Sequence, residues 1–243
     1  MHFGLKEATK DVDVILQSPS ELKILTESLE SLGYRSPSNI EILRPYKKME
    51  ASNILKNDDG FRWDIFYGQV CGALTFSNQM MARTSVLYQK NLTSVFLASK
   101  EDLFLFKAIT EREADLDDMR LLAESGLNWN VIEQECSNQT ILSGRLWGNA
   151  LLQNLIELER KYNIKSPLRK RLEAIVEEKL AEDAVLKALR EGKNTIATIS
   201  KTTRLPQYFI RVCTKKMEKE GLIRFGKSKR PYKISALIIN EKT

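Results

Sequence analysis

The sequence predicts an α+β protein made of two modules joined by helices, and three observations support this prediction. Short β-branched strand patterns that carry carboxylates alternate with amphipathic helix patterns over residues 1–138. Long helical patterns rich in Leu and Ile follow at 139–192. Residues 193–243 combine two helix patterns with a turn and a basic hairpin. We expect a mixed β-sheet with helices, then a helical bridge, then a small basic domain whose first helix begins near residue 168.

The composition excludes several classes of protein. No apolar run approaches the roughly 18 residues of a membrane span, and the N-terminus has no signal-peptide pattern. The three cysteines, Cys71, Cys136 and Cys213, are far apart and odd in number, which favours buried thiols in a reducing cytoplasm. A single histidine, His2, argues against hydrolases that use a histidine base and against zinc clusters. We expect a cytoplasmic protein without membrane contact.

The charge is divided unevenly along the chain. Residues 165–243 carry 20 Lys and Arg against 9 Asp and Glu, a net charge of +11, whereas the rest of the chain has a net charge of −5. A basic segment behind an acidic one indicates two modules, of which the second faces a polyanion such as duplex DNA or RNA.

The first strand pattern, residues 10–16, carries two aspartates separated by one residue, Asp11 and Asp13. Side chains at i and i+2 of a strand point to the same face. A second strand pattern, residues 61–67, carries a third carboxylate, Asp64. Hard divalent cations prefer oxygen ligands, and two of them can clamp an in-line phosphoryl transfer. We therefore expect Asp11, Asp13 and Asp64 to form a catalytic Mg²⁺ site, although a solvent-exposed strand face or an Arg partner for Asp64 is the alternative.

The elements between these strands and the bridge follow from caps, turns and periodicity. A helix is predicted from Pro19, capped by Ser18 or Ser20, to Gly33. The remaining expectations are a strand at 40–43, a polar helix or loop at 47–57, a hairpin at 85–97, a helix at 99–110 behind a capping box, and helices to about 123, at 128–136, at 141–163 and at 168–191.

The segment Gly4–Asp13, together with Asp64 and the helix Lys107–Asp118, resembles the nucleotidyltransferase superfamily of DNA polymerase β. More closely, it is similar to the small prokaryotic members related to abortive-infection toxins, and the resemblance covers roughly residues 1–135. The resemblance implies a nucleoside triphosphate substrate, Mg²⁺ on the three aspartates, and a phosphate contact from Lys107. The alternative for Lys107 is a solvated or snorkelling side chain.

One departure from that superfamily concerns the phosphate cradle. The resembling proteins place a Gly-Gly or Gly-Ser turn at a helix start before the Asp-x-Asp strand, where backbone N–H groups bind the triphosphate. Only ten residues precede Asp11, and they hold no such turn. Either the reading frame begins further upstream or the cradle is lost, in which case catalysis is in doubt.

The C-terminal pattern is a short helix at 195–200, a turn at 202–206, a helix at 207–220 and a hairpin at 222–234. We expect Phe209, Val212, Cys213 and Met217 to point inward. This layout resembles a winged helix-turn-helix domain over about 168–240, which implies a recognition helix in the major groove and a wing on the phosphates. The residues that we expect to contact DNA are Arg204, Gln207, Tyr208, Arg211, Lys215, Lys227, Lys229 and Arg230. Lys216 and Lys219 belong to the same basic set.

Two functions therefore stay open from the sequence. The first is a Mg²⁺-dependent nucleotidyltransferase that moves a nucleoside monophosphate from an NTP to a hydroxyl of nucleic acid or protein. The second is a catalytically inactive DNA-binding regulator or toxin–antitoxin component that keeps the fold. A winged helix can also serve protein contacts, and the long helices at 141–191 leave a homodimer or an antitoxin partner open.

Overall fold

The computed structural model describes residues 10–37, 51, 53–109, 113–226 and 232–237. The chain divides into two compact units, Met1–Arg169 and Lys170–Thr243. Strands and helices are mixed in both, so the predicted α+β class is confirmed. Within the described ranges, every helix is too short or too polar to cross a membrane.

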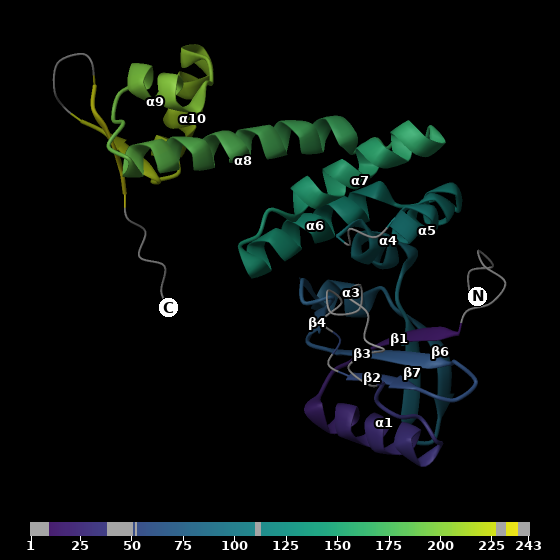
Figure 1. Ribbon diagram of the computed structural model, residues 1–243. Coiled ribbons are helices and arrows are strands. Elements are labelled where there is room, and N and C mark those ends of the chain that lie inside the picture. The colour runs from purple at the N-terminus through teal and green to yellow at the C-terminus, as the bar shows by residue number, and fades with distance from the viewer. Residues whose placement is uncertain (1–9, 38–50, 52, 110–112, 227–231, 238–243) are drawn as a thin grey trace. The chain divides into compact units, whose positions relative to one another are not determined.

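Among its described residues, the first unit contains a five-stranded mixed sheet (Figure 1). Its central strand, β3 (Arg62–Tyr67), pairs in parallel with β1 (Asp11–Leu16) and antiparallel with β2 (Asn53–Lys56). Two short strands, β4 (Gln69–Val70) and β5 (Leu74–Thr75), extend the sheet beyond the end of β3. The Asp-bearing strand is therefore hydrogen-bonded directly to the strand that carries Asp64.

Helix α1 (Pro19–Ser31) covers one face of this sheet. Ser18 and Glu21 form the capping box that starts the helix: the Ser18 hydroxyl accepts from the Glu21 N–H, and the Glu21 carboxylate accepts from the Ser18 N–H. Leu29 of the helix packs with Leu55 and Ile65 of the sheet in a buried cluster. Side chains alternate between the two faces along a strand. The strand residues next to Leu55 and Ile65 therefore point to the opposite face of the sheet.

The remainder of the first unit is a β-hairpin and a group of helices. The hairpin strands have exposed side chains throughout except at Leu97. In chain order, the elements are α3 (Asn78–Ala82), β6 (Ser85–Lys90), β7 (Thr93–Leu97), α4 (Lys100–Ala108), α5 (Glu113–Glu124), α6 (Trp129–Ser143) and α7 (Trp147–Tyr162).

A buried polar network joins these helices. The Arg83 guanidinium donates to Asp102 of α4 at 2.5 and 3.2 Å and to Glu135 of α6 at 2.7 Å. Ser77 and Gln139 also donate to Glu135, at 2.9 and 3.0 Å. Asp102 and Glu135 are 1% and 2% exposed, so their charges depend on this single arginine and its neighbours.

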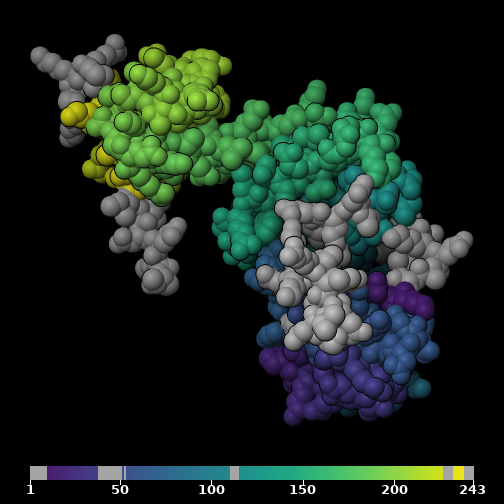
Figure 2. All heavy atoms as spheres, in the orientation of Figure 1, coloured from purple at the N-terminus to yellow at the C-terminus, as the bar shows by residue number. Residues whose placement is uncertain are grey.

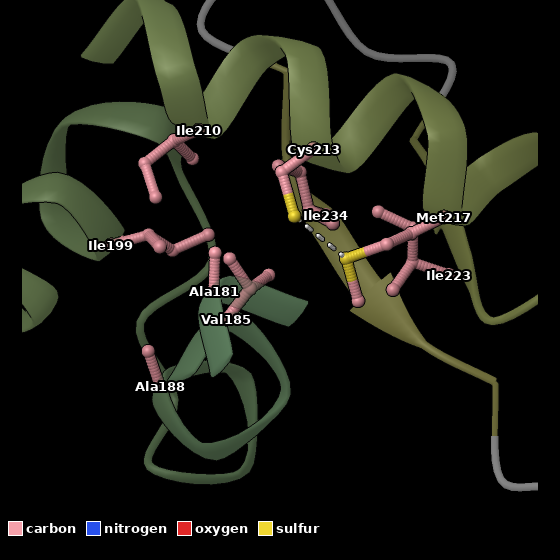
Figure 3. Packing of buried hydrophobic residues seen from close by; sticks show 9 residues of the cluster. All are labelled: Ala181, Val185, Ala188, Ile199, Ile210, Cys213, Met217, Ile223 and Ile234. Atoms are coloured by element: carbon pink, nitrogen blue, oxygen red, sulfur yellow. Dashed lines mark hydrogen bonds between the residues drawn. The ribbon is translucent and has the colours of Figure 1, made fainter. Parts of the chain in front are cut away.

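The described residues of the second unit form three helices and a two-stranded hairpin. Its elements are α8 (Arg169–Arg190), α9 (Ile196–Thr203), α10 (Gln207–Lys219), β8 (Ile223–Phe225) and β9 (Ile234–Ala236). All five contribute to one buried cluster (Figure 3), made of Ala181, Val185, Ala188, Ile199, Ile210, Cys213, Met217, Ile223 and Ile234. The unit thus has a core of its own.

Several local predictions differ from the structure. Residues 53–56 form strand β2 instead of a polar helix or loop. Helix α7 begins at Trp147 and not at 141, because Gly144 adopts a left-handed conformation and ends α6. Val212 does not point inward: it is 63% exposed. The strand expected at 40–43 lies outside the described residues.

The cysteines agree with the expected buried thiols at two of three positions. Cys136 and Cys213 are buried, and Cys71 is partly exposed. Burial raises the pKa of Cys136 to about 12 and that of Cys213 to about 11, and nearby carboxylates act in the same direction. Both thiols are therefore protonated and weakly reactive near neutral pH.

Candidate functional site

The strand register brings the three predicted metal ligands to one face of the sheet. Asp13 of β1 lies beside Asp64 of β3, and Asp11 lies beside Arg62. The i and i+2 positions of both strands share a face, which is opposite to the Leu55–Ile65 cluster. The geometry therefore gathers Asp11, Asp13 and Asp64 on the same face.

Arg62 enters this carboxylate face; the sequence left an Arg partner for Asp64 open but did not identify which arginine. Its Nη2 donates to Asp64 Oδ2 at 2.9 Å and lies 3.6 Å from Asp11 Oδ2 on the neighbouring strand. Asp64 is 1% exposed, so a cation beside it offsets the cost of burying its charge. The available signal was the spacing Arg62-Trp63-Asp64, which places the arginine and the aspartate on one strand face.

The carboxylate face does not fit a divalent metal as it stands. Oxygen donors suit Mg²⁺, and three carboxylates are present on one face. However, the guanidinium already contacts two of them, Asp64 and Asp11. Within the described part of the chain, no group of three His, Cys, Asp or Glu side chains is arranged to hold a metal ion.

Lys107 is held between two helices of the first unit. Its ammonium on α4 donates to Asp115 Oδ1 at 2.8 Å and lies 3.0 Å from Asp118 Oδ2, both on α5. Burial alone would lower the pKa of Lys107, but the hydrogen bonds and charges of these two carboxylates raise it above the ordinary lysine value. Asp115 and Asp118 thus brace α4 against α5. Arg112 lies outside the described residues.

In the second unit, a short turn joins α9 to α10. Thr195 caps α9, with its hydroxyl accepting from the Thr198 N–H at 3.2 Å. Arg204 ends that helix in the left-handed region, with φ of 59°, and its side chain is exposed. The Ser200 hydroxyl donates to the Leu205 carbonyl at 2.6 Å, across the turn. Helix α10 begins after this turn, at Gln207.

One face of α10 is buried and the other is exposed and basic. The buried face consists of Ile210, Cys213, Thr214 and Met217. Figure 2 shows α9 and α10, in yellow-green, at the surface of this unit. Three cationic side chains on the exposed face, Arg211, Lys215 and Lys219, make no ion pair with any described residue. The full exposed set is Gln207, Tyr208, Arg211, Val212, Lys215, Glu218 and Lys219.

Lys216 differs from these neighbours, because its ammonium group lies close to three carboxylates, two of which are on α8. Its Nζ lies 2.9 Å from Glu178, 3.5 Å from Glu182 and 3.6 Å from Glu220. The hydrogen bond to Glu178 is the largest of the effects that raise its pKa above the ordinary lysine value. We therefore assign Lys216 to packing of α10 on α8.

The hairpin of the second unit adds further basic residues. Lys227, Lys229 and Arg230 lie outside the described residues. Arg224 on β8 and Lys233, just before β9, are exposed at the base of this hairpin and were missed from the sequence. The signal was present in the alternation, since Arg224 lies between Ile223 and Phe225, whose side chains pack in or against the core.

Comparison of the chain with protein-family models finds no match, and comparison with curated proteins finds no significant one.

Proposed function

We propose that the chain is a DNA-binding regulator whose C-terminal unit contacts duplex DNA through α10, in the manner of a winged helix-turn-helix domain. The observation that carries this proposal is the exposed face of α10, where Arg211, Lys215 and Lys219 are not neutralised by any described side chain. The order of elements in this unit also supports it: two helices joined by a turn are followed by a basic hairpin. The first unit serves as a nucleotidyltransferase-like module.

The physical basis is the phosphate charge of DNA. A protein that neutralises phosphates with Lys and Arg releases condensed counterions, and this release drives sequence-independent binding. The three cations lie along one helix face at spacings of four residues, so a groove-bound α10 can present them together. Gln207 and Tyr208, at the exposed start of α10, supply the base-edge contacts, because the start of a recognition helix contacts the bases.

The test is a salt series of fluorescence anisotropy measurements with the full chain and a random duplex of about 25 base pairs, long enough for two helical turns. We expect log Kd to rise with log salt between about 50 and 200 mM, with a slope of about 0.9 per neutralised phosphate. The double substitution Arg211→Gln and Lys215→Gln should weaken binding and lower that slope.

A charge-matched control comes from the first unit. Lys23→Gln with Lys90→Gln removes the same net charge from two exposed positions outside α10. This control should bind like the wild type at each salt concentration. Equal loss in both double variants would show that only net charge matters. Tighter binding to an RNA duplex than to a DNA duplex of the same sequence would assign the surface to RNA instead.

The second candidate function is nucleotidyl transfer by the first unit, and the register of β1 and β3 favours it. Asp11, Asp13 and Asp64 share one face, as the resemblance to nucleotidyltransferases requires. The contacts of Arg62 with two of these carboxylates count against it. Incubation of the chain with each α-labelled NTP, with and without nucleic acid, tests this function. Label transfer that Asp13→Asn abolishes would favour the enzyme over the regulator.

A further inference from the structure

The carboxylate face of the first unit already contains a positive charge supplied by the chain itself. Arg62 lies on β3, which carries Asp64, beside β1, which carries Asp11 and Asp13, and its side chain is 16% exposed. It contacts Asp64 at 2.9 Å on its own strand and Asp11 at 3.6 Å on β1. A single guanidinium thus links the carboxylates of both strands.

The burial of Asp64 shows why a cation is needed there. An ionised carboxylate that is 1% exposed is costly unless a charged partner or a hydrogen bond compensates it. The guanidinium is planar, carries five N–H donors and stays protonated across the physiological pH range. It can therefore serve carboxylates on adjacent strands at once, and no change of pH near neutrality releases it.

We propose that Arg62 is the resident cation of this face, meaning that its guanidinium takes the place at Asp11 and Asp64 where a phosphoryl-transfer site would hold a divalent metal ion. A metal ion and the guanidinium compete for the same oxygen atoms, because both need the lone pairs of Asp64 and Asp11. The face binds a divalent cation well only when the Arg62 side chain is absent or displaced. This inference does not depend on DNA binding by the second unit.

Two properties follow for the wild-type chain. The fold of the first unit needs no metal, so EDTA leaves its thermal midpoint unchanged. Added Mn²⁺, used as a probe for Mg²⁺, gives little stabilisation, because a ligand stabilises a fold only when its concentration exceeds its Kd for the folded state.

The experiment compares the wild-type chain, Arg62→Gln and Arg62→Lys in two ways. Mn²⁺ binding is measured by titration followed by electron paramagnetic resonance, and stability is measured by thermal unfolding with Mn²⁺ or EDTA. Arg62→Gln should lower the midpoint in EDTA by several degrees, since it leaves Asp64 without its cation. It should bind Mn²⁺ about tenfold or more tightly than the wild type, because a competing charged hydrogen bond is removed. Mn²⁺ should then recover part of the lost midpoint, whereas Arg62→Lys, which keeps the charge but not the planar fork of donors, should lose less of the midpoint than Arg62→Gln and show little Mn²⁺ response.

A double variant keeps the proposal testable if Arg62→Gln does not fold. Arg62→Gln with Asp64→Asn replaces the charged pair by neutral polar groups, so no buried charge is left without a cation; it should fold, have a higher midpoint than Arg62→Gln and show no Mn²⁺ response. Failure of this double variant to fold would overturn the proposal. So would tight Mn²⁺ binding by the wild type that Asp64→Asn removes, or an Arg62→Gln variant unchanged in both midpoint and Mn²⁺ affinity. DNA binding by the same variants separates this result from the proposed function, because it should stay at the wild-type level throughout.

Discussion

The positive charges of the two units differ in what surrounds them. In the first unit, Arg62, Arg83 and Lys107 each contact at least two carboxylates within the same unit. In the second unit, Arg211 and Lys215 lie on an exposed helix face and make no ion pair with a described residue. A cation that carboxylates already neutralise stabilises the fold, whereas an exposed cation without such partners is available to a polyanion. Counting basic residues in the sequence does not separate these two kinds.

The largest expected effect concerns a neutralised cation. Arg83→Met should lower the free energy of unfolding of the first unit by about 3–5 kcal/mol, because it leaves two buried carboxylates without their cation. Urea denaturation followed by circular dichroism measures this loss. The matched control is Arg160→Met, because Arg160 pairs with Glu157 on the exposed surface of α7. Similar losses in the two variants would contradict the distinction between buried and exposed pairs.

The pH dependence of the free energy of unfolding is a second test of the neutralised charges in the first unit. Burial alone would raise the pKa of Glu135, but the hydrogen bonds from Arg83, Gln139 and Ser77 lower it below its ordinary value. A carboxyl whose folded pKa is depressed stabilises the fold above its unfolded pKa, and this stabilisation is lost as the pH falls through the folded pKa.

We therefore expect the free energy of unfolding to decrease on acidification below the usual pKa of glutamate. Glu135→Gln should make that decrease shallower, although the variant is less stable near neutral pH. Urea titrations at a series of pH values check this. An unchanged acid dependence in Glu135→Gln would assign the decrease to other carboxyls.

A smaller effect is expected for sequence discrimination by the second unit. Tyr208→Ala or Gln207→Ala should reduce the difference in binding free energy between a selected site and a random duplex by about 1–3 kcal/mol. Replacement of Lys227, Lys229 and Arg230 by Ala should instead weaken binding to both duplexes alike, since phosphate contacts carry no sequence information. Equal effects of the two sets on both duplexes would contradict this division of roles.

The strands of the candidate site could be predicted from the sequence because alternation and carboxylate spacing determine the shared face. Asp11 and Asp13 needed only the two-residue period, and the parallel register then placed Asp13 beside Asp64. The contact of Arg62 with Asp11 depended on the pairing of two distant strands. Local periodicity contains no information on which strands pair.

On α10, the prediction that Val212 points inward was wrong, because the helical repeat places this residue on the exposed face. The buried residues Ile210, Thr214 and Met217 are spaced by four and three residues along one face. Val212 is two residues from both Ile210 and Thr214, about 200° around the helix from each, and so lies on the exposed face. Its apolar character favoured a buried position, but the spacing of the buried residues on α10 determines which face is buried.

The separation of Lys215 from Lys216 likewise required the structure. These residues are adjacent in sequence and chemically identical. Only the packing of α10 on α8 shows that Glu178 and Glu182 surround the second of them. This pair therefore provides the sharpest internal control in the chain.

The most direct test of the proposed DNA-binding surface compares Lys215→Ala with Lys216→Ala in the salt series of duplex binding, using the full chain. Both variants remove one positive charge from neighbouring positions of the same helix. We expect Lys215→Ala to weaken binding and to reduce the salt slope by about one. Lys216→Ala should keep the wild-type slope and show only a small loss of stability, because its partner Glu178 is partly exposed and the buried Glu182 keeps its ion pair with Lys179. Equal slopes for the two variants would contradict the account.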